Sequence, residues 1–288
     1  WPIQIDVLFE GYQLQQLETS WVSDVQNLSG SDGYKTPFVA YLTGLIDARA
    51  RIEDREACIK GIYVKTPKGL AKPGQYLFRQ DGILAQLFRF RDVEKRLKVF
   101  KSTVGSYKLT NAVDYMKEFM ESLSHEEINT PNLILYISKK NRNTYREALR
   151  AKNSMNNDFV GIENINGPED FDNVTFEVLP DMAGSNVMFI TNSQNIGIYE
   201  YIPTEKGKYN LQYKERDTLV MNDYKLGTGF TYVGKQLEKG SPFFGKAQFV
   251  WINDEPIFPA NHYAPIYGEA GNGILEFTFN KYYLDSKL

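Results

Sequence analysis

The chain has 288 residues, a formal net charge of −3, 42% hydrophobic residues and 24% charged residues. This amount of apolar material is sufficient for a packed core and excludes a disordered chain. No segment approaches the roughly 18 consecutive apolar residues of a membrane span. The single cysteine, Cys58, excludes an intramolecular disulfide and a cysteine-built zinc site. The near-neutral charge argues against a protein that binds nucleic acid mainly through bulk positive charge.

The length suggests one large domain or two modest ones, and no long polar linker separates two halves of the chain. The chain opens on Trp1, without an initiator methionine or a signal-peptide pattern. We therefore expect a processed N-terminus, or the start of the ordered part of a longer chain.

The first elements lead to a long helix. Alternating apolar residues predict a strand over residues 3–9, and a short helix is expected over residues 13–26. Thr36 is a good N-cap, Pro37 suits the first helical position and Gly61 suits the end, so a helix of about 36 Å is predicted over residues 37–60. Its apolar stripe consists of Phe38, Leu42, Leu45, Ile46, Ile52 and Ile59. We predict that Phe38, Leu45 and Ile52 hold this helix to a sheet.

The remainder of the chain alternates loops, short helices and strands. Residues 62–108 are interpreted as loop-rich and strand-like. Helices are predicted over residues 111–123 and 139–152, and a buried strand lies between them at 133–137. The alternation of Tyr224, Leu226, Thr228, Phe230 and Tyr232 is typical of a half-buried strand. Further strands are expected at 176–179, 187–190, 196–202, 211–213, 218–220, 248–252 and 274–279.

The motifs that could carry chemistry are weak. Gly227-Thr228-Gly229 interrupts an alternating strand and no helix opens after it, so we interpret it as part of the strand rather than a phosphate loop. Cys58 lies inside the long helix and is expected to be a packing residue rather than a nucleophile. His125, His262, the pair Glu126-Glu127 and the glycine-rich stretch 268–273 are interpreted as surface or turn residues. We assign no catalytic residue, no cofactor and no metal site.

A basic run follows the loop-rich region and is interleaved with apolar residues. One interpretation is a strip that faces DNA or an acidic patch on a neighbouring subunit. The other is the solvent face of an amphipathic strand. The run consists of Arg89, Arg91, Lys95, Arg96, Lys98 and Lys101.

The order of segments resembles the major capsid proteins of tailed bacteriophages, which have the Hong Kong 97-type fold. A long helix ends in Arg55–Gly61, and a loop then reaches Asp81-Gly82-Ile83-Leu84. A strand-and-helix pair and a "Val-x-Pro-x-Met" strand then follow in the order of the family. The segments after the loop that carry the resemblance are 130–138, 145–150, 176–182, 187–191 and 211–217. The resemblance as a whole covers residues 37–254.

The resemblance implies an α+β, Hong Kong 97-like fold with a long spine helix. The peripheral domain, with long strands, would comprise residues 37–108 and 209–254, with the spine helix at 37–60. The axial α/β domain would comprise residues 109–208, with loops 153–173 and 181–186 around the five-fold and six-fold axes. Residues 1–36 would be an N-terminal arm or extended-loop remnant, and residues 255–288 a C-terminal extension.

The resemblance also implies a function. It predicts a major capsid protein that self-assembles as hexamers and pentamers into the icosahedral head of a tailed double-stranded DNA phage. Packaged DNA would lie on the inner face, and the partners would be a portal and decoration or scaffold proteins, with no membrane. Such a protein is assembled in the host bacterial cytoplasm and resides in the virion. The 19 Tyr and 18 Phe residues suit this expectation, because aromatic side chains supply large amphipathic contact areas.

Two alternatives stay open. The same fold would serve an encapsulin-like bacterial nanocompartment, which would enclose protein cargo instead of DNA. An enzyme, such as a carbohydrate-active protein, would instead show a deep pocket with two carboxylates roughly 5–10 Å apart.

Overall fold

The computed structural model describes residues 2–27, 37–63, 76–123, 128, 132–153, 166–200, 205–233 and 250–257. The chain divides into two compact units. Unit 1 comprises Trp1–Gln80 and Ile198–Gly227, and unit 2 comprises Asp81–Gly197 and Thr228–Leu288. These boundaries, at 80, 197 and 227, differ from the boundaries of the peripheral and axial domains that the sequence predicts at 108, 208 and 254, so the peripheral and axial assignment stays a prediction.

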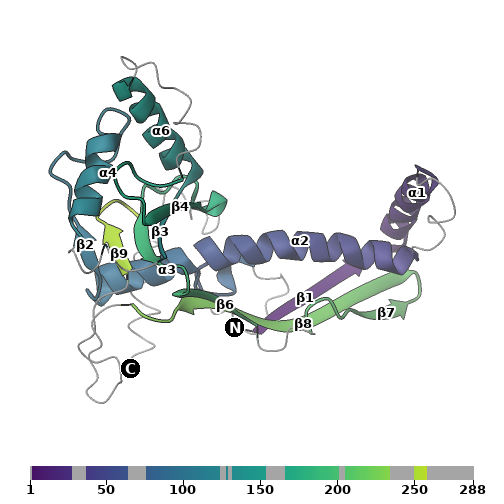
Figure 1. The fold of residues 1–288 in the computed structure, drawn as a ribbon. Coiled ribbons are helices and arrows are strands. Elements are labelled where there is room, and N and C mark those ends of the chain that lie inside the picture. Colours follow the sequence, from purple (N-terminus) through teal and green to yellow (C-terminus); the bar gives the residue numbers. More distant parts are fainter. Residues whose placement is uncertain are drawn as a thin grey trace, which may run out of the picture. The chain divides into compact units, whose positions relative to one another are not determined.

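Unit 1 is built on a long helix that runs beside a sheet (Figure 1). The helices are α1 (Gly11–Asn27), α2 (Phe38–Lys60) and the short 3-10 helix η2 (Tyr76–Phe78). The strands are β1 (Pro2–Phe9), β7 (Asn210–Lys214) and β8 (Asp217–Phe230), with β6 (Ile196–Glu200). β1 pairs antiparallel with β8 over the whole length of β1, from Pro2 opposite Lys225 to Phe9 opposite Thr218. β7 and β6 also pair with β8, and the boundaries between the units fall inside β6 and β8.

α2 forms because the sequence supplies good helix formers and a buried stripe. Its buried residues on the sheet side recur at intervals of four and three, which matches the 3.6-residue period. Leu42 and Ile46 pack with Val220 of β8, and β1 and α1 add partly buried apolar residues to this cluster. Pro37, with φ −60° and ψ 146°, occupies the N-cap position, so the helix begins one residue later than predicted; Thr36 lies outside the described residues.

Gly61 ends α2 for a steric reason. Its backbone is extended, with φ −63°, so the glycine is not needed for a left-handed conformation. A Cβ at this position would instead lie 2.4 Å from the Ala57 carbonyl oxygen and 2.7 Å from that of Gln80. The predicted stop at Gly61 is therefore confirmed, and its cause is the close approach of two backbone segments.

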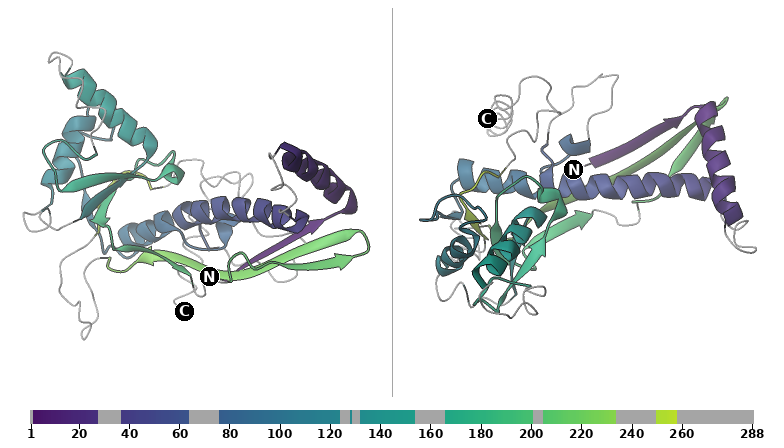
Figure 2. Two further views of the ribbon diagram at one scale, coloured as in Figure 1. Left: turned by 45° about the vertical axis from the view of Figure 1, so that its right-hand side comes forward. Right: turned by 90° about the horizontal axis from the view of Figure 1, so that it is seen from above.

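Unit 2 places helices against a mixed sheet whose strand order is β2-β9-β5-β3-β4. β3 pairs parallel with β4 and antiparallel with β5, and β2 pairs parallel with β9. Figure 2 shows α4 and α6 side by side on this sheet. The strands are β2 (Lys98–Phe100), β3 (Leu133–Ile137), β4 (Val174–Val178), β5 (Phe189–Asn192) and β9 (Val250–Asn253). The helices are α3 (Ile83–Phe88), the π-helical η3 (Arg89–Val93), α4 (Ala112–Glu121), α6 (Lys139–Asn153) and the 3-10 helix η5 (Pro180–Met182).

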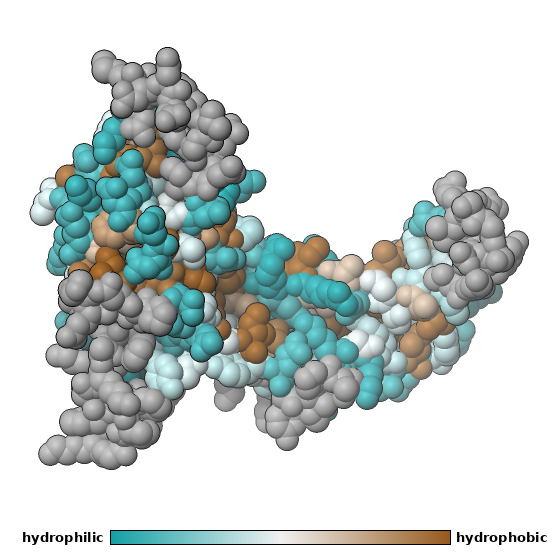
Figure 3. Space-filling model, viewed as in Figure 1, coloured by the Kyte–Doolittle hydropathy of each residue, from teal (hydrophilic) through white to brown (hydrophobic). Residues whose placement is uncertain are grey.

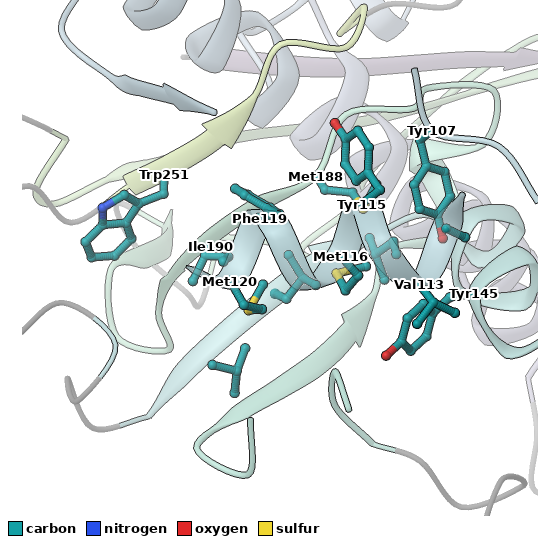
Figure 4. Close-up of a cluster of buried hydrophobic side chains, with 14 of the residues drawn as sticks. Tyr107, Val113, Tyr115, Met116, Phe119, Met120, Tyr145, Met188, Ile190 and Trp251 are labelled. Atoms are coloured by element: carbon teal, nitrogen blue, oxygen red, sulfur yellow. The ribbon is translucent and has the colours of Figure 1, made fainter. Parts of the chain in front are cut away.

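The main core of unit 2 lies between α4, α6 and the sheet (Figure 4). Phe119 and Met120 of α4 are fully buried, as are Leu135 of β3 and Leu149 of α6. Tyr107 donates a hydrogen bond through its hydroxyl to the Asn141 carbonyl oxygen at 2.9 Å, which satisfies the polar end of a buried ring. Leu133–Ile137 is confirmed as a buried strand.

The α+β class that the sequence predicts is confirmed, with helices and sheets in both units. One prediction is wrong: residues 83–93, expected to be loop-rich and strand-like, form α3 and η3. Another is refined, because the strands expected at 218–220 and 224–232 form the single strand β8. The strand predicted at 274–279 lies outside the described residues, as do His125, His262, Glu126, Glu127 and residues 268–273.

Candidate interaction surfaces

The first candidate surface is the outward face of α2. Leu45 is 44% exposed and Ile52 is 45% exposed. The two residues are seven positions apart in the sequence and therefore lie on one side of the helix. Ala48 lies between them and is also exposed. α2 therefore has two apolar faces, one covered by the sheet of unit 1 and one open to solvent.

This finding corrects the prediction that Leu45 and Ile52 hold the helix to the sheet. Seven residues make nearly two turns, so Leu45 and Ile52 share one side of the helix, and at about 100° per residue that side is turned away from Ile46. Of the predicted packing residues, Leu42 and Ile59 are buried, and Phe38 is half-buried beside the Trp21 ring, 5.8 Å away between centroids. The residues that cover the sheet side of α2 are Leu42, Ile46, Ala50, Asp54 and Ala57.

The sheet of unit 1 adds further exposed apolar side chains. Tyr213 of β7 is 71% exposed, and Ile198 and Tyr199 of β6 and Leu8 of β1 are exposed as well. In Figure 3, hydrophobic residues appear in brown along the visible face of this unit. Tyrosine and large aliphatic side chains at such density are typical of surfaces that contact another protein.

Asp54 forms a buried ionic cluster inside unit 1 that sequence analysis missed. It accepts hydrogen bonds from Arg79 and, at 2.7 Å, from the hydroxyl of Tyr224, and it forms an ion pair with Lys206 at 2.8 Å. Burial tends to lower the pKa of Lys206, but the hydrogen bond and charge of Asp54, with Glu200, raise it above its ordinary value. Burial first, and then the hydrogen bond to Asp54, raise the pKa of Tyr224. The cluster joins α2, the segment after η2, the turn at 205–207 and β8.

Cys58 is a packing residue, as predicted. It is 5% exposed and packs with Ile3, Tyr224 and Leu226. Burial raises the pKa of its thiol, so the reactive thiolate is disfavoured. A nucleophilic role has no support in this environment.

The three arginines of the basic run are held by the protein itself. The Arg91 guanidinium donates to the carbonyl oxygens of Asn253 at 2.9 Å and Glu255 at 2.8 Å. Arg89 and Arg96 both form ion pairs with Glu94, at 3.4 and 3.1 Å. These arginines fix η3 and the turn after it, and the interpretation as one amphipathic strand is wrong because Arg89 and Arg91 lie in a helix.

The three lysines of the run differ from the arginines in exposure. Lys95, Lys98 and Lys101 are all exposed. Lys98 belongs to β2, at the edge of the five-stranded sheet, and lies opposite Trp251 of β9 in the parallel register. The predicted strip is thus divided into an internal arginine part and a solvent-facing lysine part.

Two cavities lined by residues that the structure describes bear on binding or catalysis. In unit 1, a cavity of 390 Å³ lies over the β1–β8 pair and includes Glu205 and Asp223. Asp223 is exposed, whereas a catalytic acid needs a buried environment to keep its proton. In unit 2, a cavity of 280 Å³ lies beside β2 and includes Lys98, Lys101 and Trp251.

Among the residues that the structure describes, no three His, Cys, Asp or Glu side chains lie close enough to hold a metal ion. Within the same ranges, no helix combines the length and apolar character needed to cross a bilayer.

Comparison with known proteins gives structural similarity at low sequence identity. No family model and no curated protein matches the chain. The chain is similar to one in the procapsid of satellite phage P4, which includes the size-determination protein Sid, with 12% identity and a TM-score of 0.49. That match covers 87% of this chain and 69% of the other.

Two more solved structures are similar to this chain at low sequence identity. A chain from the capsid of the Myoviridae phage XM1 has 8% identity and a TM-score of 0.42, and the match covers 88% of this chain and 72% of that one. A chain from Mycobacterium phage Che8 has 7% identity and a TM-score of 0.39, with 88% and 70% covered. The P4 and XM1 structures are a procapsid and a capsid.

Proposed function

We propose that this chain is a major capsid protein that assembles with copies of itself into the closed icosahedral head of a tailed double-stranded DNA phage. The observation that carries the proposal is the double-faced helix α2, whose outward stripe at Leu45 and Ile52 stays exposed in the single chain. A structural subunit of a shell needs extended contact surfaces and no catalytic cluster.

Two further features support the proposal. The elements predicted from the resemblance occur in the expected order: a long helix, a strand followed by a helix, and a long alternating strand. Exposed Tyr213, Tyr199 and Ile198 add apolar area on the sheet of unit 1. Burial of such apolar area stabilises a contact by about 25 cal/mol per Å². A closed shell contains many copies of the same contact, so even modest contacts add up.

The finer assignments belong to the same proposal. Residues 37–108 and 209–254 would form the peripheral domain, and residues 109–208 the axial domain. The subunits would form hexamers and pentamers, with DNA on the inner face, a portal, and scaffold or decoration proteins as partners. The protein would be assembled in the host cytoplasm and would act as a structural component of the virion, without catalysis.

Two measurements test the proposal: the size of the assembly that the purified chain forms, and what particles from the natural source enclose. We expect the expressed chain to sediment as large particles, and particles from the natural source to contain DNA that is protected from nuclease. Protein cargo in place of DNA would favour the nanocompartment alternative. A monomer that hydrolyses a glycoside, and loses that activity on Asp223→Asn or Glu205→Gln, would favour the enzyme.

A further inference from the structure

The two edges of the five-stranded sheet in unit 2 carry opposite charge. One edge is β2, and residues 89–101, which we call the basic edge, hold six basic and two acidic residues. The other edge is β4, and residues 169–177, which we call the acidic edge, hold four acidic residues and no basic one. The net charges of these two segments are therefore +4 and −4, in a chain whose formal net charge is −3.

The two edges of one chain cannot neutralise each other. The strand order β2-β9-β5-β3-β4 puts four inter-strand spacings between β2 and β4. At about 4.8 Å per spacing the two strands lie about 19 Å apart, whereas an ion pair needs a nitrogen–oxygen distance of about 4 Å or less. The opposite charges are therefore available to a partner at either edge.

The exposed cations of the basic edge are its lysines. The arginines are held inside the chain by Glu94 and by backbone carbonyl oxygens, and Lys98 also has an interaction partner within the chain. The inference therefore uses Lys95 and Lys101, which are exposed and flank β2 in the sequence.

The acidic edge presents side chains rather than free backbone. The Phe176 N–H donates to the Asn166 carbonyl oxygen at 2.6 Å, so the side of β4 that is turned away from β3 is already bonded there. Glu169 forms an ion pair with Lys152 at 3.9 Å. A partner at this edge therefore meets the other three acidic side chains, which are exposed. These are Asp170, Asp172 and Glu177.

A cavity of 280 Å³ beside β2 offers a place for one carboxylate at the basic edge. Lys101 and Trp251 are among its lining residues, and Figure 4 shows Trp251 at the margin of the hydrophobic cluster. Trp251 is 3% exposed, and its Nε1–H has no acceptor among the residues that the structure describes. A buried N–H without an acceptor is costly, so its retention beside a cavity points to an acceptor that a partner supplies.

We propose that the acidic edge of one copy docks on the basic edge of the next copy, an inference that rests on the proposed shell function. Copies lie side by side in a shell, and the chain itself supplies the complementary anionic surface. Like edges repel each other, so charge favours a head-to-tail contact, which closes into a ring when the rotation between copies permits. Glu177 belongs to β4 itself and has the longest side chain of the three exposed carboxylates. Its carboxylate enters the cavity, pairs with Lys101 and accepts the Trp251 N–H.

Zero-length cross-linking of the wild type tests this contact. A water-soluble carbodiimide joins a carboxylate to a lysine amine that touches it, and takes up the water that is lost. We expect particles assembled from a mixture of isotopically labelled and unlabelled chains to give mixed-isotope peptide pairs that join Lys101 to Glu177, detected by mass spectrometry. Lys101→Arg keeps the charge but removes the amine, so it should assemble normally and lose only this cross-link.

A charge swap tests the energetics of the same contact. Glu177→Lys reverses one charge, so we expect the chain concentration for half-maximal assembly, measured by sedimentation velocity, to rise about tenfold at low salt and less at high salt. The double variant Glu177→Lys/Lys101→Glu restores the attraction and should recover most of that loss. Glu147→Lys reverses an exposed charge on α6 and is the matched control, which should stay within about twofold of the wild type.

The outcomes separate this contact from the shell itself. Particles that form without a mixed-isotope cross-link between the two edges, or a double variant that assembles no better than Glu177→Lys, would overturn the contact and leave the shell function standing. A wild-type chain that stays a single subunit would overturn both. Circular dichroism checks that the variants are folded; if one is not, the cross-link in the wild type decides the question alone.

Discussion

At the residue scale, Asp54 shows how one buried carboxylate organises distant parts of a unit. Its side chain contacts Arg79, Lys206 and Tyr224, which lie 25, 152 and 170 residues away in the sequence. A charge removed from water is stable only when oppositely charged or hydrogen-bonding groups surround it. Removing one partner of this cluster is therefore expected to lower the free energy of unfolding.

We predict that Asp54→Asn destabilises the protein by about 3 kcal/mol, because the half-buried Arg79 loses its counter-charge and Lys206 keeps only Glu200, 3.6 Å away. Chemical denaturation monitored by circular dichroism measures this change. Asp47→Asn is the matched control, since Asp47 forms an i,i+4 pair with the exposed Arg51 at 2.7 Å, and such pairs are worth about 0.3–0.5 kcal/mol. Similar losses in the two variants would contradict the role of the cluster.

Lys206 gives this cluster a pH dependence at the alkaline end. Since its pKa is raised in the folded state, its contribution is fully present below the ordinary value of 10.5 and is lost as pH rises through the higher folded pKa. We expect the free energy of unfolding to fall more steeply above pH 10.5 in the wild type than in Lys206→Met. Parallel curves for the two proteins would show that Lys206 does not contribute.

At the element scale, α2 uses its two apolar faces for different purposes. Leu42, 2% exposed, belongs to the face that packs on the sheet of unit 1, whereas Leu45 belongs to the face that stays open. The first contributes to folding of the single chain. The second is available for contact with another copy, which is the sense in which α2 supports the proposed assembly.

These roles predict opposite phenotypes for two leucines three residues apart. Leu42→Ala should cost about 2–5 kcal/mol of folding stability, because it leaves a cavity in a packed cluster. Leu45→Asp should leave stability within about 1 kcal/mol of the wild type but abolish assembly. Thermal melting and sedimentation velocity measure the two effects. Normal particles from Leu45→Asp would refute the role of the outward face.

The elements differ in how well the sequence predicts them. β8 was predictable because its alternation places Val220, Tyr224 and Leu226 on one buried face. α3 was missed because Ile83, Leu84, Ala85 and Leu87 are all buried, and a helix buried on every side has no amphipathic period. The Asp54 cluster and the unpartnered Trp251 could not be predicted, since both depend on contacts between residues far apart in the sequence.

At the scale of the whole molecule, the chain combines low net charge with apolar surface on a folded scaffold. A net charge of −3 in 288 residues opposes self-association only weakly. Exposed Leu8, Ile198 and Tyr213 on unit 1, together with Val104 and Leu109 on unit 2, leave apolar area on both units. Such a surface is explained most directly by contact with further copies of the chain.

Electron microscopy of negatively stained, purified full chain tests this account most directly. The account predicts uniform closed particles with icosahedral symmetry, formed by the wild type and absent in Leu45→Asp. A wild-type chain that stays a single, stable subunit at every concentration and salt condition tried would contradict it.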